Sequence, residues 1–259
     1  MRYTFEDIVV CLKESGIKQG DTIFFTTGLG MIGLPPEGIK NLDDLNFFFL
    51  EAIKKVLGKN GNIFVPAYSY TFGKSTACNL AIFDPVSTPA ETGSFPNYFL
   101  KQKGVIRSTD PMVSVAGLGP KCNAFFENIP NNSYAEGSFF SRLVKSDAKC
   151  CSIGLGPNWT PFIHYADWLY KVPFRYDKLF YGLIKNGNWL VKTPWIYSCR
   201  ILCEESMPTA YNAARLATKA GIWNFAPIGR ARIYSAKIND YFEFICSHLE
   251  KDKWFLAKG

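Results

Sequence analysis

The sequence predicts a three-layer α/β/α fold with a mixed sheet and a β-rich C-terminal part. An amphipathic helix over residues 41–57 is enclosed between two short apolar strands, residues 22–25 and 62–66, an alternation typical of α/β proteins. A third apolar run, residues 150–153, ends in a Gly-Pro loop and passes into a helical pattern. No linker, repeat or low-complexity tract interrupts the chain. We therefore expect residues 1–259 to form a single domain with a large core.

Composition and charge exclude several classes of protein. The chain is 47% hydrophobic and 20% charged, which is the composition of a globular protein. No run of 18 apolar residues occurs, so we expect no membrane span. The N-terminus carries Glu6 and Asp7 and no apolar segment, so we expect no secretory signal and a cytoplasmic protein. The net charge of +7 favours an anionic ligand. The lysines and arginines are dispersed along the chain, which argues against a nucleic-acid groove.

The eight cysteines show no metal-binding pattern. Cys150 and Cys151 are adjacent, and Cys199 and Cys203 have no second pair of ligands near them. Without a secretion signal, we expect reduced thiols in the core and no metal. A catalytic cysteine needs basic, partly exposed surroundings, which no cysteine shows in the sequence. A thiol hydrolase that uses one of the cysteines remains an alternative. An activity that is insensitive to alkylating agents would exclude it.

Helices and strands alternate along the first part of the chain. Apolar residues at helical spacing predict a helix over residues 5–15, which Gly16 ends. β-Branched and aromatic residues predict the strand at 22–25, and Asn41 is a suitable cap for the helix that follows. We also predict short helices and strands in the middle of the chain: helices at 96–103, 120–126 and 134–143, a strand leading to Gly117 and a strand at 149–154.

The sequence beyond Lys178 is less regular. Two short runs at 189–191 and 195–197 predict antiparallel strands. Residues 225–235 contain Pro227 and Gly229 and predict a hairpin or a strand facing a cofactor. Helices are expected at 211–220 and 239–249, and His248 near the end of the last helix suits the helix dipole, so we interpret it as structural.

Two strand ends carry polar loops. Thr26-Thr27-Gly28-Leu29-Gly30 follows the first strand, and its backbone N–H groups could turn towards a phosphate or an amide-rich cofactor arm. The spacing matches neither the Walker pattern nor the dinucleotide fingerprint, so this signal alone favours a tight glycine-rich turn. After the next strand, the polar and aromatic stretch 68–73, which starts at Tyr68, is of the kind that lines a pocket.

His164 is the strongest catalytic candidate. It is one of two histidines, and Asp167 lies three positions on, which places both side chains on one helix face. That is a general-base arrangement, although a surface histidine beside an acid has the same spacing. The position of His164 after a strand and a glycine-rich loop favours a catalytic role, because open α/β sheets place their sites there.

Several motifs, taken in order, resemble the aminoglycoside 3-N-acetyltransferase family. The resemblance runs over roughly residues 5 to 178 and returns at Gly229-Arg230-Ala231. The shared motifs are Gly20-Asp21, Thr26 to Gly30, Val65-Pro66, Ser87-Thr88-Pro89 with Gly93, Arg107-Ser108 with Pro111, Glu136-Gly137-Ser138 and Thr160 to Asp167.

The resemblance implies transfer of an acetyl group from acetyl-CoA to an amine of an amino sugar in a ternary complex, without a metal. Amines are protonated at neutral pH, and His164 has a suitable pKa for a base. Asp167 would stabilise the imidazolium or hold the substrate. The expected CoA-binding residues are Thr26, Thr27, Gly28, Arg107 and Ser108, and the expected substrate-binding residues are Tyr68, Asp110 and Glu136.

The chain departs from the family where the acceptor would bind. The family's usual His-Pro after Arg-Ser is here Asp110-Pro111, and Asp167 replaces a glutamate. The net charge of +7 does not suit a polycationic aminoglycoside, so we expect an anionic amino sugar, for example a nucleotide-linked one. Aminoglycoside acetylation with antibiotic resistance is the alternative, and a non-catalytic binding protein is a further one that His164 argues against. An oligomer is possible.

Overall fold

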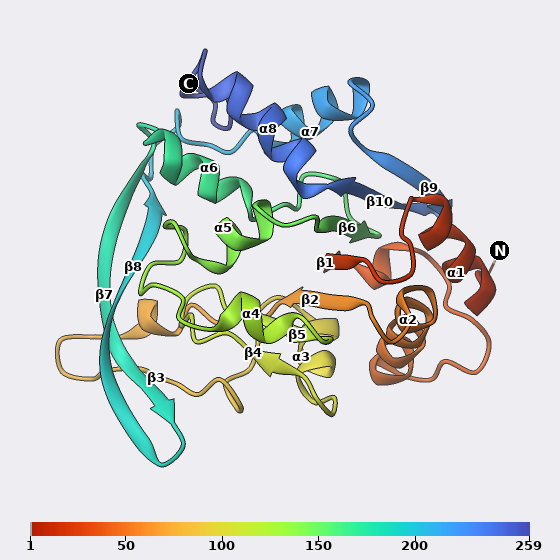
Figure 1. The fold of residues 1–259 in the computed structure, drawn as a ribbon, viewed down its shortest axis with the longest axis horizontal. Coiled ribbons are helices and arrows are strands. Elements are labelled where there is room, and N and C mark those ends of the chain that lie inside the picture. The colour runs from red at the N-terminus through yellow and green to blue at the C-terminus, as the bar shows by residue number, and fades with distance from the viewer. Residues whose placement is uncertain (1) are drawn as a thin grey trace.

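The computed structural model describes residues 2–259, and its centre is a seven-stranded mixed sheet (Figure 1). The seven strands are β1 (Thr22–Thr27), β2 (Asn62–Pro66), β4 (Ile106–Arg107), β5 (Val115–Leu118), β6 (Lys149–Ile153), β9 (Asn224–Ile228) and β10 (Ala231–Lys237). Their order across the sheet is β4-β5-β2-β1-β6-β10-β9. The mixed α/β fold predicted from the sequence is confirmed.

The centre of the sheet is parallel and its flanks are antiparallel. β1 pairs in parallel with β2 and with β6, whereas β5 and β10 run against their neighbours. β9 is antiparallel to β10 and so runs in the same direction as β6. The carboxyl ends of β1, β2, β6 and β9 therefore meet at one edge of the sheet. The next parallel strands lie on opposite sides of β1, so the strand order changes direction there. Open α/β proteins place their sites outside the carboxyl ends of the strands at such a position.

Helices cover both faces of this sheet. One layer holds α1 (Phe5–Glu14), α2 (Leu42–Leu57), the turn η1 (Leu29–Met31) and α3 (Ser94–Leu100). The other holds α4 (Cys122–Phe126), α5 (Phe139–Val144), α6 (Ile163–Tyr170), α7 (Ala210–Lys219) and α8 (Ile238–Leu249). In β1, Ile23 and Phe25 pack on the first layer and Phe24 on the second, because successive strand residues point to opposite faces. Each layer thus has its own apolar core.

A second sheet of three strands lies along the side of the molecule away from α1 and α2 (Figure 1). It consists of β3 (Ile82–Phe83), β7 (Arg175–Asn186) and β8 (Trp189–Arg200), with the turn η2 (Thr71–Lys74) beside it. We predicted only two short strands within β8 and missed β7. Gly187 at φ +59° begins the two-residue turn Gly187-Asn188, a hairpin signal that the sequence already contains.

The predicted hairpin at 225–235 is present as β9 and β10, but it belongs to the central sheet. The β-rich C-terminal part is therefore divided between the two sheets. The helices predicted at 5–15, 41–57 and 239–249 match α1, α2 and α8 to within one residue.

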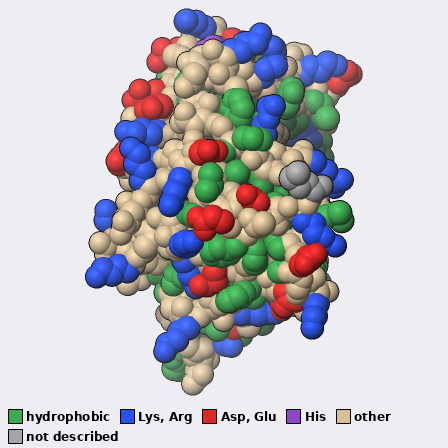
Figure 2. Space-filling view, turned by 90° about the vertical axis from the view of Figure 1, so that its right-hand side faces the viewer, with side chains coloured by type: hydrophobic (Ala, Val, Ile, Leu, Met, Phe, Trp, Pro, Cys, Tyr) green, Lys and Arg blue, Asp and Glu red, His purple; other side chains and the backbone are tan. Residues whose placement is uncertain are grey.

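Among residues 2–259, every helix is too short or too polar to cross a bilayer. Figure 2 shows lysines and arginines scattered over one face with acidic side chains between them.

Gly154 provides a test of how β6 ends. Its φ is +77°, and a Cβ added to it would lie 2.5 Å from the carbonyl oxygen of Gly28. Gly154→Ala combines backbone strain with this clash, so we expect the free energy of unfolding to fall by roughly 3 kcal/mol in urea titrations. The control Gly187→Ala has a positive φ but no neighbour within 4 Å, and should lose only about 1 kcal/mol. Equal losses for the two variants would contradict this account.

Candidate active site

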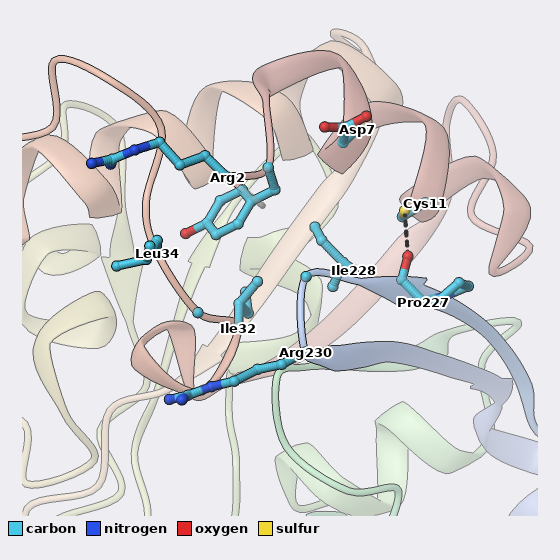
Figure 3. Close-up of a pocket in the computed structure, with 11 residues that line it drawn as sticks. Arg2, Asp7, Cys11, Ile32, Leu34, Pro227, Ile228 and Arg230 are labelled. Atoms are coloured by element: carbon cyan, nitrogen blue, oxygen red, sulfur yellow. Dashed lines mark hydrogen bonds between the residues drawn. The ribbon is translucent and has the colours of Figure 1, made fainter.

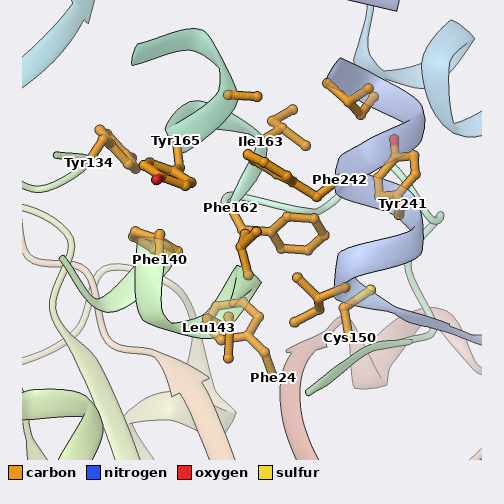
Figure 4. Packing of buried hydrophobic residues seen from close by; sticks show 14 of the residues in the cluster. Phe24, Tyr134, Phe140, Leu143, Cys150, Phe162, Ile163, Tyr165, Tyr241 and Phe242 are labelled. Carbon is orange, nitrogen blue, oxygen red and sulfur yellow. The ribbon is translucent and has the colours of Figure 1, made fainter. Parts of the chain in front are cut away.

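His164 occupies the first turn of α6, and the residues before it are anchored in the core. Figure 4 shows Phe162 and Ile163 packed towards Tyr241 and Phe242 of α8. The rings of Phe162 and Tyr241 lie 6.0 Å apart, nearly perpendicular. Burial of these side chains fixes the start of α6 and therefore the position from which His164 extends.

His164 and Asp167 are in contact. The Nδ1 atom of His164 lies 2.8 Å from Oδ2 of Asp167, as expected for residues three apart on one helix face. The side chain of Asp167 is 2% exposed, whereas that of His164 is 26% exposed. The carboxylate is therefore held inside the protein while the imidazole is accessible from solvent.

Arg175 completes this group, and no sequence pattern predicted its place there. It is the first residue of β7, and its Nε lies 2.8 Å from the same Oδ2 of Asp167. Its Nη2 lies 3.4 Å from Nε2 of His164, and its Nη1 donates a hydrogen bond of 2.9 Å to the carbonyl of Ser198. One carboxylate oxygen is thus shared by an imidazole and a guanidinium.

These surroundings lower the pKa of His164. Burial has the largest effect, the positive charge of Arg175 adds to it, and the contact with Asp167 opposes both. The imidazole is therefore neutral at pH 7. A carboxylate can only accept, so the hydrogen-bond network assigns the ring proton to Nδ1 and the lone pair to Nε2.

Four tyrosines, which we call the tyrosine cluster, lie beside His164. Tyr134 meets the imidazole edge-on at 5.4 Å between centroids, and Tyr197 of β8 lies 5.7 Å from Tyr134. Tyr70 joins Tyr197 to Tyr68 at 6.4 and 6.2 Å. Tyr70 has φ +47°, an uncommon conformation for a residue with a side chain, and is 37% exposed. The loop predicted to line a pocket contains Tyr68 and Tyr70, and of the four tyrosines we expected only Tyr68 to bind substrate.

Asp110, which we predicted to bind substrate, lies buried beside the tyrosine cluster. Its Oδ1 accepts hydrogen bonds of 2.8 and 2.9 Å from the backbone N–H groups of Met112 and Val113. Burial raises the pKa of Asp110 to about 6. Burial also raises the pKa of Tyr68, and the neighbouring Tyr70, Tyr197 and Asp110 add to this effect. With 6% exposure, this carboxylate acts on the site through its charge rather than through a free surface.

Glu136, the other acidic residue predicted to bind substrate, makes its contacts elsewhere. Its Oε2 accepts a hydrogen bond of 2.7 Å from the hydroxyl of Tyr165, and its Oε1 forms an ion pair with Lys145. The bond from Lys145 contributes most to a pKa lowered to about 2. The structure therefore does not bring Glu136 together with His164 and Asp167.

Arg107 and Ser108, which we expected at the CoA phosphates, are engaged inside the protein. Arg107 donates to Ser114 Oγ at 3.0 Å and to the carbonyls of Ala67 and Thr88. Ser108 Oγ accepts a bond of 2.9 Å from the N–H of Val115. These bonds tie the ends of β2, β4 and β5 together and engage both side chains within the protein.

Thr26, Thr27 and Gly28 lie at the carboxyl end of β1, at the sheet edge described above. The N–H of Gly28 donates to the carbonyl of Ile153 at 2.8 Å, so it is not free to bind a phosphate. A Cβ at Gly28 would meet the side chain of Leu155 at 2.5 Å, so glycine permits close packing of the two loops here. The hydroxyls of both threonines make no hydrogen bond to residues 2–259 and can serve a ligand.

A separate cavity of about 510 Å³ lies beyond this loop (Figure 3). Arg2 and Arg230 lie on its walls, and Cys11 donates a hydrogen bond of 3.0 Å to the carbonyl of Pro227 at its side. Arg230 Nε donates to the carbonyl of Met31 at 3.1 Å. The cavity is lined by neither His164 nor the tyrosine cluster.

The cysteines are free thiols, and two groups of them differ in setting. Burial raises the pKa of Cys122 and Cys150 to about 12, so these thiols are poor nucleophiles. Cys78 and Cys203 are exposed. The part of the chain that the structure describes holds no group of three or more histidine, cysteine or acidic side chains placed to bind a metal ion.

Comparison with known proteins identifies the family. The sequence model of the family described as "Aminoglycoside 3-N-acetyltransferase" matches residues 37–250. The chain belongs to this family. Curated relatives include aminoglycoside N(3)-acetyltransferase VII of Streptomyces paromomycinus, 24% identical over 62% of this chain and 59% of the relative. Aminoglycoside N(3)-acetyltransferase IX of Micromonospora chalcea is also 24% identical, over 62% of this chain and 60% of the relative. The matches span about three fifths of these relatives.

Solved structures of aminoglycoside 3-N-acetyltransferases share the fold over nearly the whole chain. The enzyme AAC(3)-Xa superposes with a TM-score of 0.81 at 22% identity, covering 96% of this chain and 93% of the other. AAC-IIIb, solved in a binary complex with CoASH, gives 0.80 at 19% identity and covers 97% of both chains. The family predicted from the sequence motifs is thus confirmed.

Asp110 provides a test of the charge beside the tyrosine cluster. Its pKa rises from the ordinary 3.8 to about 6 on folding, so the folded protein binds this proton more tightly and loses stability as pH rises between these values. Asp110→Asn removes the titration. From pH 4 to pH 7 we expect the stability of the variant relative to the native protein to rise by up to about 3 kcal/mol in urea titrations. A difference that is constant with pH would contradict the buried, titrating carboxylate.

Proposed function

We propose that this protein transfers the acetyl group of acetyl-CoA to an amine of an amino sugar, with His164 as the general base. The observation that carries the proposal is a partly exposed imidazole whose Nδ1 lies 2.8 Å from the buried carboxylate of Asp167. Membership of the aminoglycoside 3-N-acetyltransferase family supports it. Residues 1–259 would act as a single acetyltransferase domain in the cytoplasm. The proposed activity is compatible with association of the protein into an oligomer.

The chemistry needs one base. As the amine nitrogen bonds to the thioester carbonyl carbon, Nε2 of His164 accepts the proton that the nitrogen loses. The C–S bond then breaks, and His164 returns the proton to the departing sulfur. Asp167 stabilises the imidazolium between these events. The hydroxyls of Thr26 and Thr27, which make no hydrogen bond within residues 2–259, would hold the pantetheine arm at the carboxyl end of β1.

The charges around the tyrosine cluster bear on the acceptor. The backbone N–H of Glu91 donates to the carbonyl of Tyr68, and the Glu91 carboxylate pairs with Lys74. Asp167 pairs with Arg175, and Asp110 is buried. A site for a polycation is expected to present uncompensated negative charge, which these three carboxylates do not.

We therefore propose an acceptor that itself carries negative charge, such as an amino sugar linked to a nucleotide diphosphate. The net charge of +7 agrees with this choice. The alternative is an aminoglycoside, which the names of the curated relatives favour, as does the neighbour AAC-VIa, solved bound to sisomicin.

His164→Ala tests the base. Loss of the group that accepts the proton should lower kcat by about 10²- to 10⁴-fold while the Kd for CoA stays nearly the same. Steady-state kinetics and calorimetric titration with CoA measure the two quantities. The matched control is His248→Ala, since His248 contacts Phe244 and Phe255 in the terminal helix region and should keep native kcat. An unchanged kcat in His164→Ala would refute the assignment.

The acceptor is tested with a substrate panel. We expect acetyl-CoA turnover with nucleotide-linked amino sugars, with a kcat/KM at least tenfold above that for any aminoglycoside tested, because the acidic groups of the site are already paired. Release of free thiol reports turnover for every acceptor. Micromolar KM values for several aminoglycosides and no turnover of the nucleotide sugars would establish the alternative.

A further inference from the structure

Arg175 of β7 contacts both α6 and β8 at the proposed base. Its guanidinium contacts Asp167 of α6 through Nε, the carbonyl of Ser198 of β8 through Nη1, and His164 Nε2 through Nη2. The side chain is 12% exposed, so these contacts are shielded from solvent. Arginine suits such a place because its rigid planar fork contacts several acceptors at fixed angles and stays protonated.

The geometry points to a role for Arg175 in the transfer that rests on the proposed function. We propose that Arg175 is a positioning residue, which holds the Asp167 carboxylate against His164 and keeps the imidazole neutral with its proton on Nδ1.

The groups that face His164 support this assignment. Asp167 approaches from α6, Arg175 from β7, and Tyr134 from the segment before α5, with Tyr197 of β8 behind it. Only Arg175 among them carries a positive charge. An aspartate alone would favour the imidazolium, because an opposite charge within about 4–6 Å stabilises the charged form. Arg175 shares that carboxylate and repels a second cation, so the balance moves to the neutral ring.

The separation between Arg175 and His164 leaves the base usable. At 3.4 Å, the contact between Nη2 and Nε2 is longer than a strong N–H donor bond, so the lone pair can still accept a substrate proton. Once protonated, the imidazolium stands beside a guanidinium and gives the proton up readily. Arg175 therefore favours both the resting state of His164 and the return of the proton to the departing sulfur.

Nuclear magnetic resonance of the two histidines tests the proposal without requiring acetyl transfer. The resonances are assigned with His248→Gln. In the native protein at pH 7 we expect the nitrogen shifts of a neutral His164 protonated on Nδ1. In Arg175→Met, the pKa of His164 should rise by about one unit or more, and Arg175→Lys, which keeps the charge, should raise it less. The apparent pKa on the acidic side of the pH profile of kcat/KM should rise by the same amount as the pKa of His164.

Arg200→Met is the matched control. Arg200 is the residue opposite Arg175 in the hairpin register, but its guanidinium contacts Ser206 and Met207 and not His164. Its loss should leave the titration of His164 unchanged.

Either of two results would overturn the proposal. One is a folded Arg175→Met protein in which His164 titrates as in the native protein. The other is a native His164 that is charged at pH 7 or carries its proton on Nε2, and this measurement decides the matter even when Arg175→Met does not fold. If the titration shifts as expected but no acceptor is acetylated, the proposed function fails and the role of Arg175 in holding the ring stands.

Discussion

The geometry of the candidate site depends on one buried carboxylate. Oδ2 of Asp167 lies 2.8 Å from both the imidazole of His164 and the guanidinium of Arg175, and its side chain is 2% exposed. A buried charge that loses one partner is left uncompensated, which typically costs several kcal/mol. Helix α6 and the β7–β8 hairpin are therefore held in register by this group, and the orientation of the imidazole depends on a strand from the second sheet.

The central sheet supplies the rigid frame for this arrangement. β1, β2 and β6 end at one edge, so the loop after β6 leads to α6 and the loop after β2 carries Tyr68 and Tyr70. Two bonds to the carbonyl of Met112, from the N–H groups of Ser69 and Tyr70, hold the second loop in place. They explain how Tyr70 keeps φ +47° while it remains partly exposed, since surrounding contacts must enforce an unfavourable backbone conformation.

Local features of the site could be predicted from the sequence, and tertiary ones could not. The contact of His164 with Asp167 follows from helix periodicity alone, and the place of Thr26 at a strand end follows from the strand–loop pattern. Arg175 escaped because β7 has exposed residues on both faces and gave no alternating pattern. The internal contacts of Arg107 could not be predicted, because the carbonyl of Ala67 that it binds lies 40 residues away in the chain.

The charge balance of the site bears on the choice of acceptor more than the fold does. Relatives with this fold are named for aminoglycosides, yet a fold is compatible with many acceptors, and recognition resides in side chains. Glu91 and Asp167 each pair with a cation of this same chain. A polycationic acceptor would have to displace Lys74 or Arg175, and losing Arg175 would also release the carboxylate that orients His164. An acceptor with its own negative charge leaves these pairs intact, so recognition and catalysis do not compete for the same carboxylates.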